Sequence, residues 1–133
     1  MKFNAIVGNP PYVCARNMEE KSKILMKRWS VCKSGNPDLY IPFFQIATEN
    51  LRIGGRIGLI TMNSFLTSLN GRALREYFSY LQYDIRIVGY SVRYPIQTFK
   101  QFCLMIIYTD ISDILCHTQI RHLLFLQLAL PIF

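Results

Sequence analysis

Asn4-Ala5-Ile6-Val7-Gly8-Asn9-Pro10-Pro11-Tyr12 is the stretch on which the interpretation of this 133-residue chain depends. Residues 3–7 form a short apolar run, which predicts a buried strand, and the run ends at a glycine followed by an Asn-Pro-Pro-Tyr sequence. Two consecutive prolines cannot continue a strand ladder, and they hold the backbone in a fixed extended course. We therefore expect residues 9–12, here called the NPPY turn, to present an amide and an aromatic ring rigidly beyond the carboxyl end of a strand. Open α/β sheets bind ligands at that end.

The chemistry of the NPPY turn has two interpretations. A stiff turn with one side-chain amide, prolyl carbonyls and one aromatic face could hold a flat ring that forms hydrogen bonds. An Asn-Pro-Pro sequence can equally be a structural turn whose tyrosine packs, half-buried, against the core. The four residues alone leave both open.

A helix is predicted over residues 38–53. Asp38 can cap its amino end, Pro42 falls in the first turn, and Gly54-Gly55 would end it. The 3.6-residue period predicts a broad inner face formed by Leu39, Tyr40, Phe43, Phe44, Ile46, Ala47 and Leu51. The outer face would carry Gln45, Thr48, Glu49 and Arg52.

The following elements predict an α/β sheet. Residues 56–61 read as a strand, which a right-handed crossover would place parallel to the first, so that the loop 62–66 emerges beside the NPPY turn. A helix is expected over residues 72–83, a short strand over 85–88, and a further apolar strand over 102–108. The inward side chains of that helix would be Leu74, Tyr77, Phe78 and Leu81.

In this order the motifs resemble adenine-N6-specific DNA methyltransferases, the modification enzymes of type II restriction systems. The resemblance covers residues 3–109 and rests on Asn9-Pro10-Pro11-Tyr12, Asp38-Leu39-Tyr40, Gly54 to Thr61, Asn63-Ser64-Phe65-Leu66 and Tyr94-Pro95. It implies part of a Rossmann-like α/β domain that uses S-adenosylmethionine, with a mixed sheet and helices on both faces, lacking its N-terminal half. It also implies that the strand over residues 102–108 is antiparallel to its neighbours, and that DNA is the partner. The four cysteines are expected to be reduced thiols in a cytoplasmic protein, and no membrane partner is expected.

The resemblance implies roles for single residues. The side-chain oxygen of Asn9 and the carbonyl of Pro10 would accept the two hydrogens of the exocyclic amine of adenine and stabilise the charge that develops on it. Tyr12 would stack on an adenine rotated out of the duplex. Direct attack on the donor methyl group requires no covalent enzyme intermediate.

Three further residues are substrate-binding candidates: Pro11, Asn63 and Tyr94. Asn63, with its neighbour Ser64, could border the substrate or cap the next helix. Tyr94 stands where the family usually has phenylalanine, and its hydroxyl needs a partner. A loop aromatic that fills a gap in the core is the alternative for Tyr94.

Residues 13–37, here called the basic segment, are the least regular part of the chain. Only Glu19 and Glu20 oppose its six cations, which are Arg16, Lys21, Lys23, Lys27, Arg28 and Lys33. A short helix over residues 18–29 would turn Ile24, Leu25 and Trp29 inward. The net charge of +7 and the pI near 9.4 suit a phosphate-bearing partner, although a solvated basic face is an equal alternative for this segment.

The donor site is largely missing from the sequence. No glycine-rich turn stands between a strand and a helix, so residues that would bind S-adenosylmethionine are unknown, and the spacing of the four cysteines and two histidines predicts no metal site. Residues 1–109 are interpreted as the C-terminal half of a catalytic domain. Residues 110–133 form an atypical apolar tail, truncated or out of frame. Within it, residues 123–133 are nearly all apolar but too few to span a bilayer.

These features predict a fragment that is inactive alone, because holding donor and base together supplies much of the rate. The N-terminal donor-binding and C-terminal recognition regions would then be separate chains. Two alternatives stay open: a DNA-binding subunit of a split methyltransferase, and a degenerate, non-functional remnant.

Overall fold

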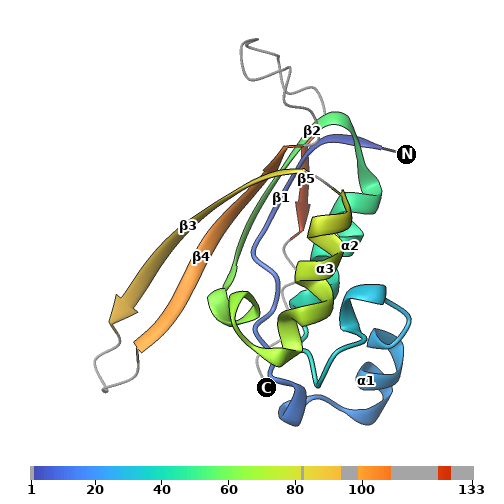
Figure 1. Cartoon of the computed structure of the whole chain (residues 1–133), viewed down its shortest axis with the longest axis vertical. Helices are drawn as coiled ribbons and strands as arrows, with labels where there is room; N and C mark the ends of the chain where they lie inside the picture. Colours follow the sequence, from blue (N-terminus) through green and yellow to red (C-terminus); the bar gives the residue numbers. More distant parts are fainter. Residues whose placement is uncertain (1, 82, 94–98, 109–122, 127–133) are drawn as a thin grey trace.

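The described residues of the computed structural model, 2–81, 83–93, 99–108 and 123–126, form a mixed sheet with helices packed against it (Figure 1). The strand order is β3-β4-β2-β1-β5. The strands are β1 (Phe3–Gly8), β2 (Leu51–Met62), β3 (Asp84–Arg93), β4 (Phe99–Tyr108) and β5 (Leu123–Leu126). The helices are α1 (Glu20–Met26), α2 (Ile41–Asn50) and α3 (Arg72–Leu81). The predicted α/β class is confirmed.

The strand directions agree with the sequence predictions. β1 runs parallel to β2, with Ile6 opposite Ile57 and Gly8 opposite Leu59. β4 lies between β2 and β3 and is antiparallel to both. Because β1 and β2 are parallel, the NPPY turn and the short helix η3 (Asn63–Leu66) leave the sheet at the same edge.

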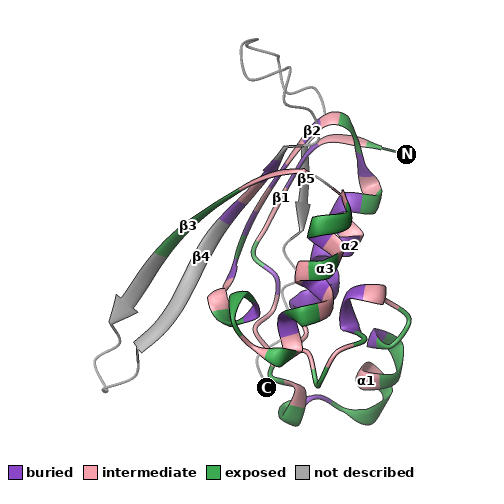
Figure 2. Cartoon of the chain, viewed as in Figure 1, coloured by how far each residue is buried: buried purple, intermediate pink, exposed green. Residues whose placement is uncertain are grey.

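The core lies on one side of the sheet, where α2 and α3 lie along it and turn their buried residues inward (Figure 2). A single apolar cluster joins Met26 of α1, Phe44 of α2 and Leu74 of α3 to Ile57 of β2. On the other side of the sheet, Ile60 of β2 is 37% exposed. Helices on that second face stay a prediction.

The glycine pair was predicted to end the helix, which is wrong. α2 ends at Asn50 and β2 starts at the next residue, so Gly54 and Gly55 lie inside the strand. The register between β1 and β2 shifts there: two steps along β1, from Phe3 to Ala5, correspond to five along β2. Gly54 has a φ of 75°, a left-handed conformation that glycine adopts without strain, and this allows β2 to bulge.

Two side-chain predictions for α2 are also wrong. Asp38 does not cap the helix; its carboxylate accepts a hydrogen bond from the backbone N–H of Ala15 at 3.1 Å. Gln45 and Thr48, predicted to face solvent, are buried, because each has a polar partner in a neighbouring element. The helical period assigns apolar residues to the inner face and polar residues to the outer face. A polar residue that is buried is therefore assigned to the wrong face.

The predicted inward face of the basic helix is wrong for two of its three residues. Ile24 and Leu25 of α1 are 56% and 46% exposed, whereas Trp29 packs half-buried against the core, as predicted, where Met18 and Met26 are buried. A helix of seven residues makes only two turns, so its apolar period does not define a face uniquely.

The apolar tail contributes to the sheet. Residues Leu123–Leu126 form β5, which runs parallel to β1 with Ala5 opposite Leu123. No structural element had been predicted for this region from the sequence. Tyr94 lies outside the described residues. In the portion of the chain that the structure describes, no helix has the length and apolar character needed to cross a membrane.

Candidate functional site

The NPPY turn lies across the carboxyl ends of β1 and β2. Asn9 is exposed, Pro10 is buried, and Pro11 and Tyr12 are half-buried. The hydroxyl of Tyr12 donates to the backbone carbonyl of Ile60 at 2.8 Å, close to the end of β2. The turn therefore occupies the edge of the sheet that the sequence predicted.

Tyr12 and Asn9 contact each other within the turn. The Tyr12 hydroxyl also donates to Oδ1 of Asn9, and since a phenol carries one hydrogen, it serves Asn9 and Ile60 in alternation. A carboxamide oxygen has two lone pairs, so Oδ1 can accept a second hydrogen bond. The contact orients the Asn9 amide with its oxygen toward Tyr12 while the side chain remains open to solvent.

An aromatic cluster supports the turn from the core side. The ring of Tyr40 packs edge-on against Tyr12, with centroids 6.5 Å apart, and it packs in the same way against Phe44 and Phe65. The Tyr40 hydroxyl hydrogen-bonds to Oγ of Ser64 at 3.0 Å. The sequence placed Tyr40 only on the inner face of a helix, and its part in joining three elements at the site was missed.

Asn63 and Ser64 follow β2 directly, at the same edge as the turn. Asn63 is half-buried and Ser64 is exposed, and neither side chain caps the short helix η3 that they begin. The capping serine is Ser68, whose hydroxyl accepts from the N–H of Gly71 at 3.2 Å. Both the capping alternative and the substrate role of Asn63 stay predictions.

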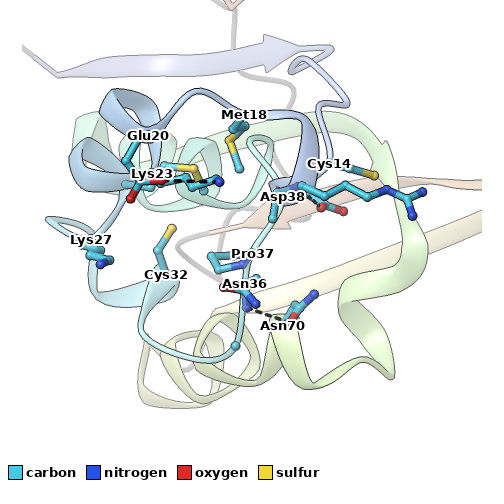
Figure 3. A pocket seen from close by; sticks show the side chains of 14 residues that line it. Cys14, Met18, Glu20, Lys23, Lys27, Cys32, Asn36, Pro37, Asp38 and Asn70 are labelled. Atoms are coloured by element: carbon cyan, nitrogen blue, oxygen red, sulfur yellow. Dashed lines mark hydrogen bonds and ion pairs between the residues drawn. The ribbon is translucent and has the colours of Figure 1, made fainter.

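A cavity of about 640 Å³ lies beside the turn, between the basic segment and the loop that carries Asn70 (Figure 3). Its lining starts at Cys14, two residues after Tyr12, and includes neither Asn9 nor Tyr12. The buried side chains of Met18, Met26 and Cys32 form part of its wall. The sequence did not predict this cavity, because Asn70 is more than thirty residues away from the other lining residues along the chain.

Burial raises the pKa of the Cys32 thiol to about 12. The thiol is therefore protonated at neutral pH and contributes an apolar surface. It is not a nucleophile in this state, because only a thiolate is an effective nucleophile. The predicted reaction likewise needs no cysteine nucleophile.

The described residues contain no glycine-rich turn between a strand and a helix. A glycine-rich turn between a strand and a helix is the usual cradle for a dinucleotide-like cofactor. The two described glycines with positive φ are Gly35, in the loop before α2, and Gly54, inside β2. Neither of them follows a strand and opens a helix. The same residues contain no group of three or more His, Cys, Asp or Glu side chains that could hold a metal ion.

The sheet and its helices define the fold of S-adenosylmethionine-dependent methyltransferases. A structure described as a class I methyltransferase of this kind from Listeria monocytogenes superposes with a TM-score of 0.59, over 93% of this chain and 36% of that one, at 10% identity. The DrdV–DNA complex superposes with a TM-score of 0.57, over 80% of this chain and 14% of that one, at 19% identity.

Residues 1–91 match the Eco57I restriction-modification methylase family, and the chain belongs to this family. It is 32% identical over 101 residues to the type II methyltransferase M.BstVI of Geobacillus stearothermophilus, covering 75% of this chain. It is 35% identical over 81 residues to M.BanIII of Aneurinibacillus aneurinilyticus, covering 60% of this chain. The chain spans 16% and 13% of the lengths of these relatives. The resemblance to restriction-modification methyltransferases is thus confirmed.

Proposed function

We propose that this chain supplies the adenine-binding part of a DNA adenine-N6 methyltransferase. The observation that carries the proposal is the exposed Asn9 amide on a proline-stiffened turn at the carboxyl edge of the sheet, with its oxygen oriented by Tyr12. That edge is where an α/β sheet of this kind binds its ligands.

The chemistry of adenine explains why two acceptors are needed. The lone pair of the exocyclic amine is delocalised into the ring, so the amine is a poor nucleophile. Oδ1 of Asn9 and the carbonyl of Pro10 accept its two hydrogens, which favours a pyramidal nitrogen and stabilises the positive charge that forms as it reacts. Oδ1 can do this while it still accepts from Tyr12, because it has a second lone pair.

The base has to leave the duplex to reach the turn. Tyr12, half-buried and packed edge-on against Tyr40, offers its ring as a surface on which a flipped adenine stacks. Pro11, Asn63 and Tyr94 complete the base-binding set in this proposal. The net charge of +7 favours association with the DNA backbone.

The methyl group comes from S-adenosylmethionine, which residues outside this chain would hold. In this proposal the isolated chain, with residues 1–109 as half of the catalytic domain, binds no donor and transfers no methyl group.

The proposal is tested by placing residues 3–109 into a full-length relative in place of its matching region. We expect Asn9→Ala to lower the rate of N6-methyladenine formation at least about 100-fold, because an acceptor aimed at the developing charge is lost. Nucleosides from digested DNA would be quantified by mass spectrometry. Donor binding, measured by calorimetry, should be unchanged.

Asn17→Ala is the matched control, since Asn17 is also exposed but lies in the basic segment. Its rate should stay within about twofold of the parent chimera. Unchanged turnover in Asn9→Ala would remove Asn9 from the mechanism. A chimera that binds donor and DNA but never methylates adenine would favour a binding subunit or a degenerate remnant.

A further inference from the structure

The cavity beside the NPPY turn has the size of a small-molecule site. Its volume of about 640 Å³ lies within the roughly 300–1,000 Å³ range of pockets that enclose a ligand. It is formed by the basic segment on one side and by Asn70 on the other, with Asn36 and Asn70 adjacent at its rim (Figure 3).

One part of the lining is apolar. Met18, Met26 and Cys32 are each less than a tenth exposed, and the Cys32 thiol is neutral because burial raises its pKa to about 12. Methionine side chains are polarizable and pack well against aromatic rings. The wall therefore suits a flat ring.

Another part of the lining can pair with the edge of a nucleobase. Oδ1 of Asn70 accepts from the backbone N–H of Asn36 at 3.0 Å, which leaves its Nδ2 as a donor. Asp38 uses Oδ1 for Ala15, and its second oxygen remains an acceptor. Carboxamides and carboxylates are the side chains that read base edges.

Gly35 makes the approach of Asn70 possible. A Cβ at this position would lie 2.2 Å from Oδ1 of Asn70, and the φ of Gly35 is 58°. Any other residue would displace Asn70 and strain the backbone. The loop is thus built to bring a side-chain amide to the cavity rim.

The charge of the lining favours an anion. Arg16, Lys23 and Lys27 face two acidic residues, of which Glu20 pairs with Lys23 at 3.6 Å. Among the described residues, Arg16 and Lys27 take part in no ion pair. Both are exposed at the cavity, where guanidinium and ammonium groups bind phosphate oxygens strongly.

The position of the cavity relates it to the turn. Cys14 has an extended backbone, with φ −64° and ψ 145°, so the two residues from Tyr12 to Cys14 span at most about 7 Å. The cavity is therefore close enough to the turn for a nucleotide that neighbours a flipped adenine in the same strand to reach it.

We propose that this cavity binds a second nucleotide of the same DNA strand, adjacent to the adenine at the NPPY turn. Its base lies on the Met18, Met26 and Cys32 wall, and its phosphate lies near Arg16 and Lys27. The assignment of the base at the NPPY turn as the methylated adenine rests on the proposed function.

Occupancy is tested on the full chain by the alkylation of Cys14, an exposed thiol in the lining. A single-stranded 12-nucleotide oligodeoxynucleotide at saturation should slow iodoacetamide modification at least about fivefold, with the Cys14 peptide identified by mass spectrometry. An unchanged rate, or no binding of the oligonucleotide, would overturn the proposal.

A free mononucleotide could carry the same chemistry as a nucleotide in a strand. Deoxyadenosine monophosphate at equal nucleotide concentration should protect Cys14 at least about tenfold less well than the oligonucleotide, because it lacks the phosphates on either side. Equal protection would show a site for free nucleotides and overturn the DNA assignment.

Affinity variants test the residues. Lys27→Ala should weaken oligonucleotide binding, measured by fluorescence anisotropy, about five- to tenfold and lower the salt dependence by about one phosphate contact. Asn70→Asp keeps the acceptor for Asn36 but replaces the donor amide with a charge, and it should weaken binding at least about tenfold. Lys21→Ala, an exposed α1 lysine outside the lining, is the control and should stay within about twofold. Equal effects of Lys27→Ala and Lys21→Ala would contradict the site.

The two proposals fail in different experiments. Protection of Cys14 without adenine methylation in the chimera would remove the methyltransferase assignment and leave the nucleotide site. Methylation that depends on Asn9, together with an unprotected Cys14, would remove the nucleotide site and leave the methyltransferase assignment.

Discussion

The NPPY turn and the basic segment follow one another along the chain, but they are held in place by different means. The turn is fixed by its own chemistry: two prolines restrict the backbone, and Tyr12 bonds to Asn9 within the turn and to Ile60 on the next strand. The basic segment contains only short helical pieces, whose own backbone hydrogen bonds close local turns.

The contacts that hold the basic segment come from outside it. Asp38 accepts from Ala15, Leu39 donates to the carbonyl of Val13 at 2.9 Å, Gln45 accepts from Ser30 and Val31, and Asn70 accepts from Asn36. The NPPY turn is thus fixed by contacts of its own residues, whereas the position of the basic segment depends on contacts with residues distant in sequence. Changes at those residues should loosen the cavity and leave the turn intact.

The largest effect is expected from Gln45→Ala. Oε1 of Gln45 accepts from Oγ of Ser30 at 3.0 Å and from the buried N–H of Val31 at 3.3 Å. A buried donor left without a partner costs about 1–3 kcal/mol, so we expect a loss of about 2–3 kcal/mol in the free energy of unfolding. Urea denaturation would measure it, and faster alkylation of the neighbouring Cys32 would show that the basic segment has opened.

Glu49→Ala is the control for Gln45. Glu49 accepts from Nε2 of Gln45 at 2.7 Å on the exposed side of α2, so its loss leaves the bonds to the basic segment in place. Its effect should be below about 1 kcal/mol. Equal destabilisation by both variants, with Cys32 unreactive in each, would show that Gln45 does not hold the segment.

A second, smaller effect concerns pH and Cys32. The pKa of this thiol rises from 9.0 to about 12 on folding because the thiolate would lose its solvation. The folded protein therefore keeps a proton that the unfolded chain releases above pH 9. The contribution of this thiol to the free energy of unfolding is fully present below pH 9 and is lost as the pH rises toward 12. The loss is about 2 kcal/mol at about pH 10.5.

The measurement is a pair of unfolding curves against pH. The steep loss of stability between about pH 9 and 10.5 should be reduced in Cys32→Ala and retained in Cys14→Ala, because Cys14 is exposed. Tyr77, whose pKa burial also raises, contributes equally to all three proteins. Identical slopes for the parent protein and Cys32→Ala would contradict the burial of the thiol.

The same contrast explains how much of the molecule could be predicted from the sequence. β1 and the NPPY turn follow from local patterns, an apolar run and two prolines, and the parallel placement of β2 follows from the right-handed crossover rule. The antiparallel direction of β4 was implied by the family resemblance. The edge of the sheet at which the NPPY turn lies could therefore be predicted.

The parts that could not be predicted depend on pairs distant in sequence. Asp38 was expected to cap a helix, since nothing local shows that the Ala15 amide needs its carboxylate. Gln45 was expected to face solvent for the same reason. The cavity depends on Gly35, which has no Cβ that would displace the side chain of Asn70. The pairing of β5 with β1 joins segments from opposite ends of the chain. A period or a motif contains no information on such contacts.

The smallest structural effect, confined to the turn, is expected from Tyr12→Phe. This variant removes the hydroxyl that contacts Asn9 and Ile60 but keeps the ring and its packing on Tyr40. We expect a loss of only about 0.5–1.5 kcal/mol in stability, the usual net value of one hydrogen bond. Alkylation of Cys14 and Cys32 should not change, because Asn9 and Ile60, the hydrogen-bond partners of the hydroxyl, lie outside the basic segment.

The functional consequence of Tyr12→Phe should exceed its structural one. Without the hydroxyl, the Asn9 amide can rotate and present its NH₂ group, which cannot accept from adenine. In the chimera, N6-methyladenine formation should fall about tenfold, while flipping of a 2-aminopurine placed at the target, followed by its fluorescence, stays close to the parent value because the ring remains. Tyr12→Ala, which removes the ring as well, should lose both signals. A Tyr12→Phe chimera that methylates at the parent rate would show that the Asn9 amide is oriented by something other than this hydroxyl.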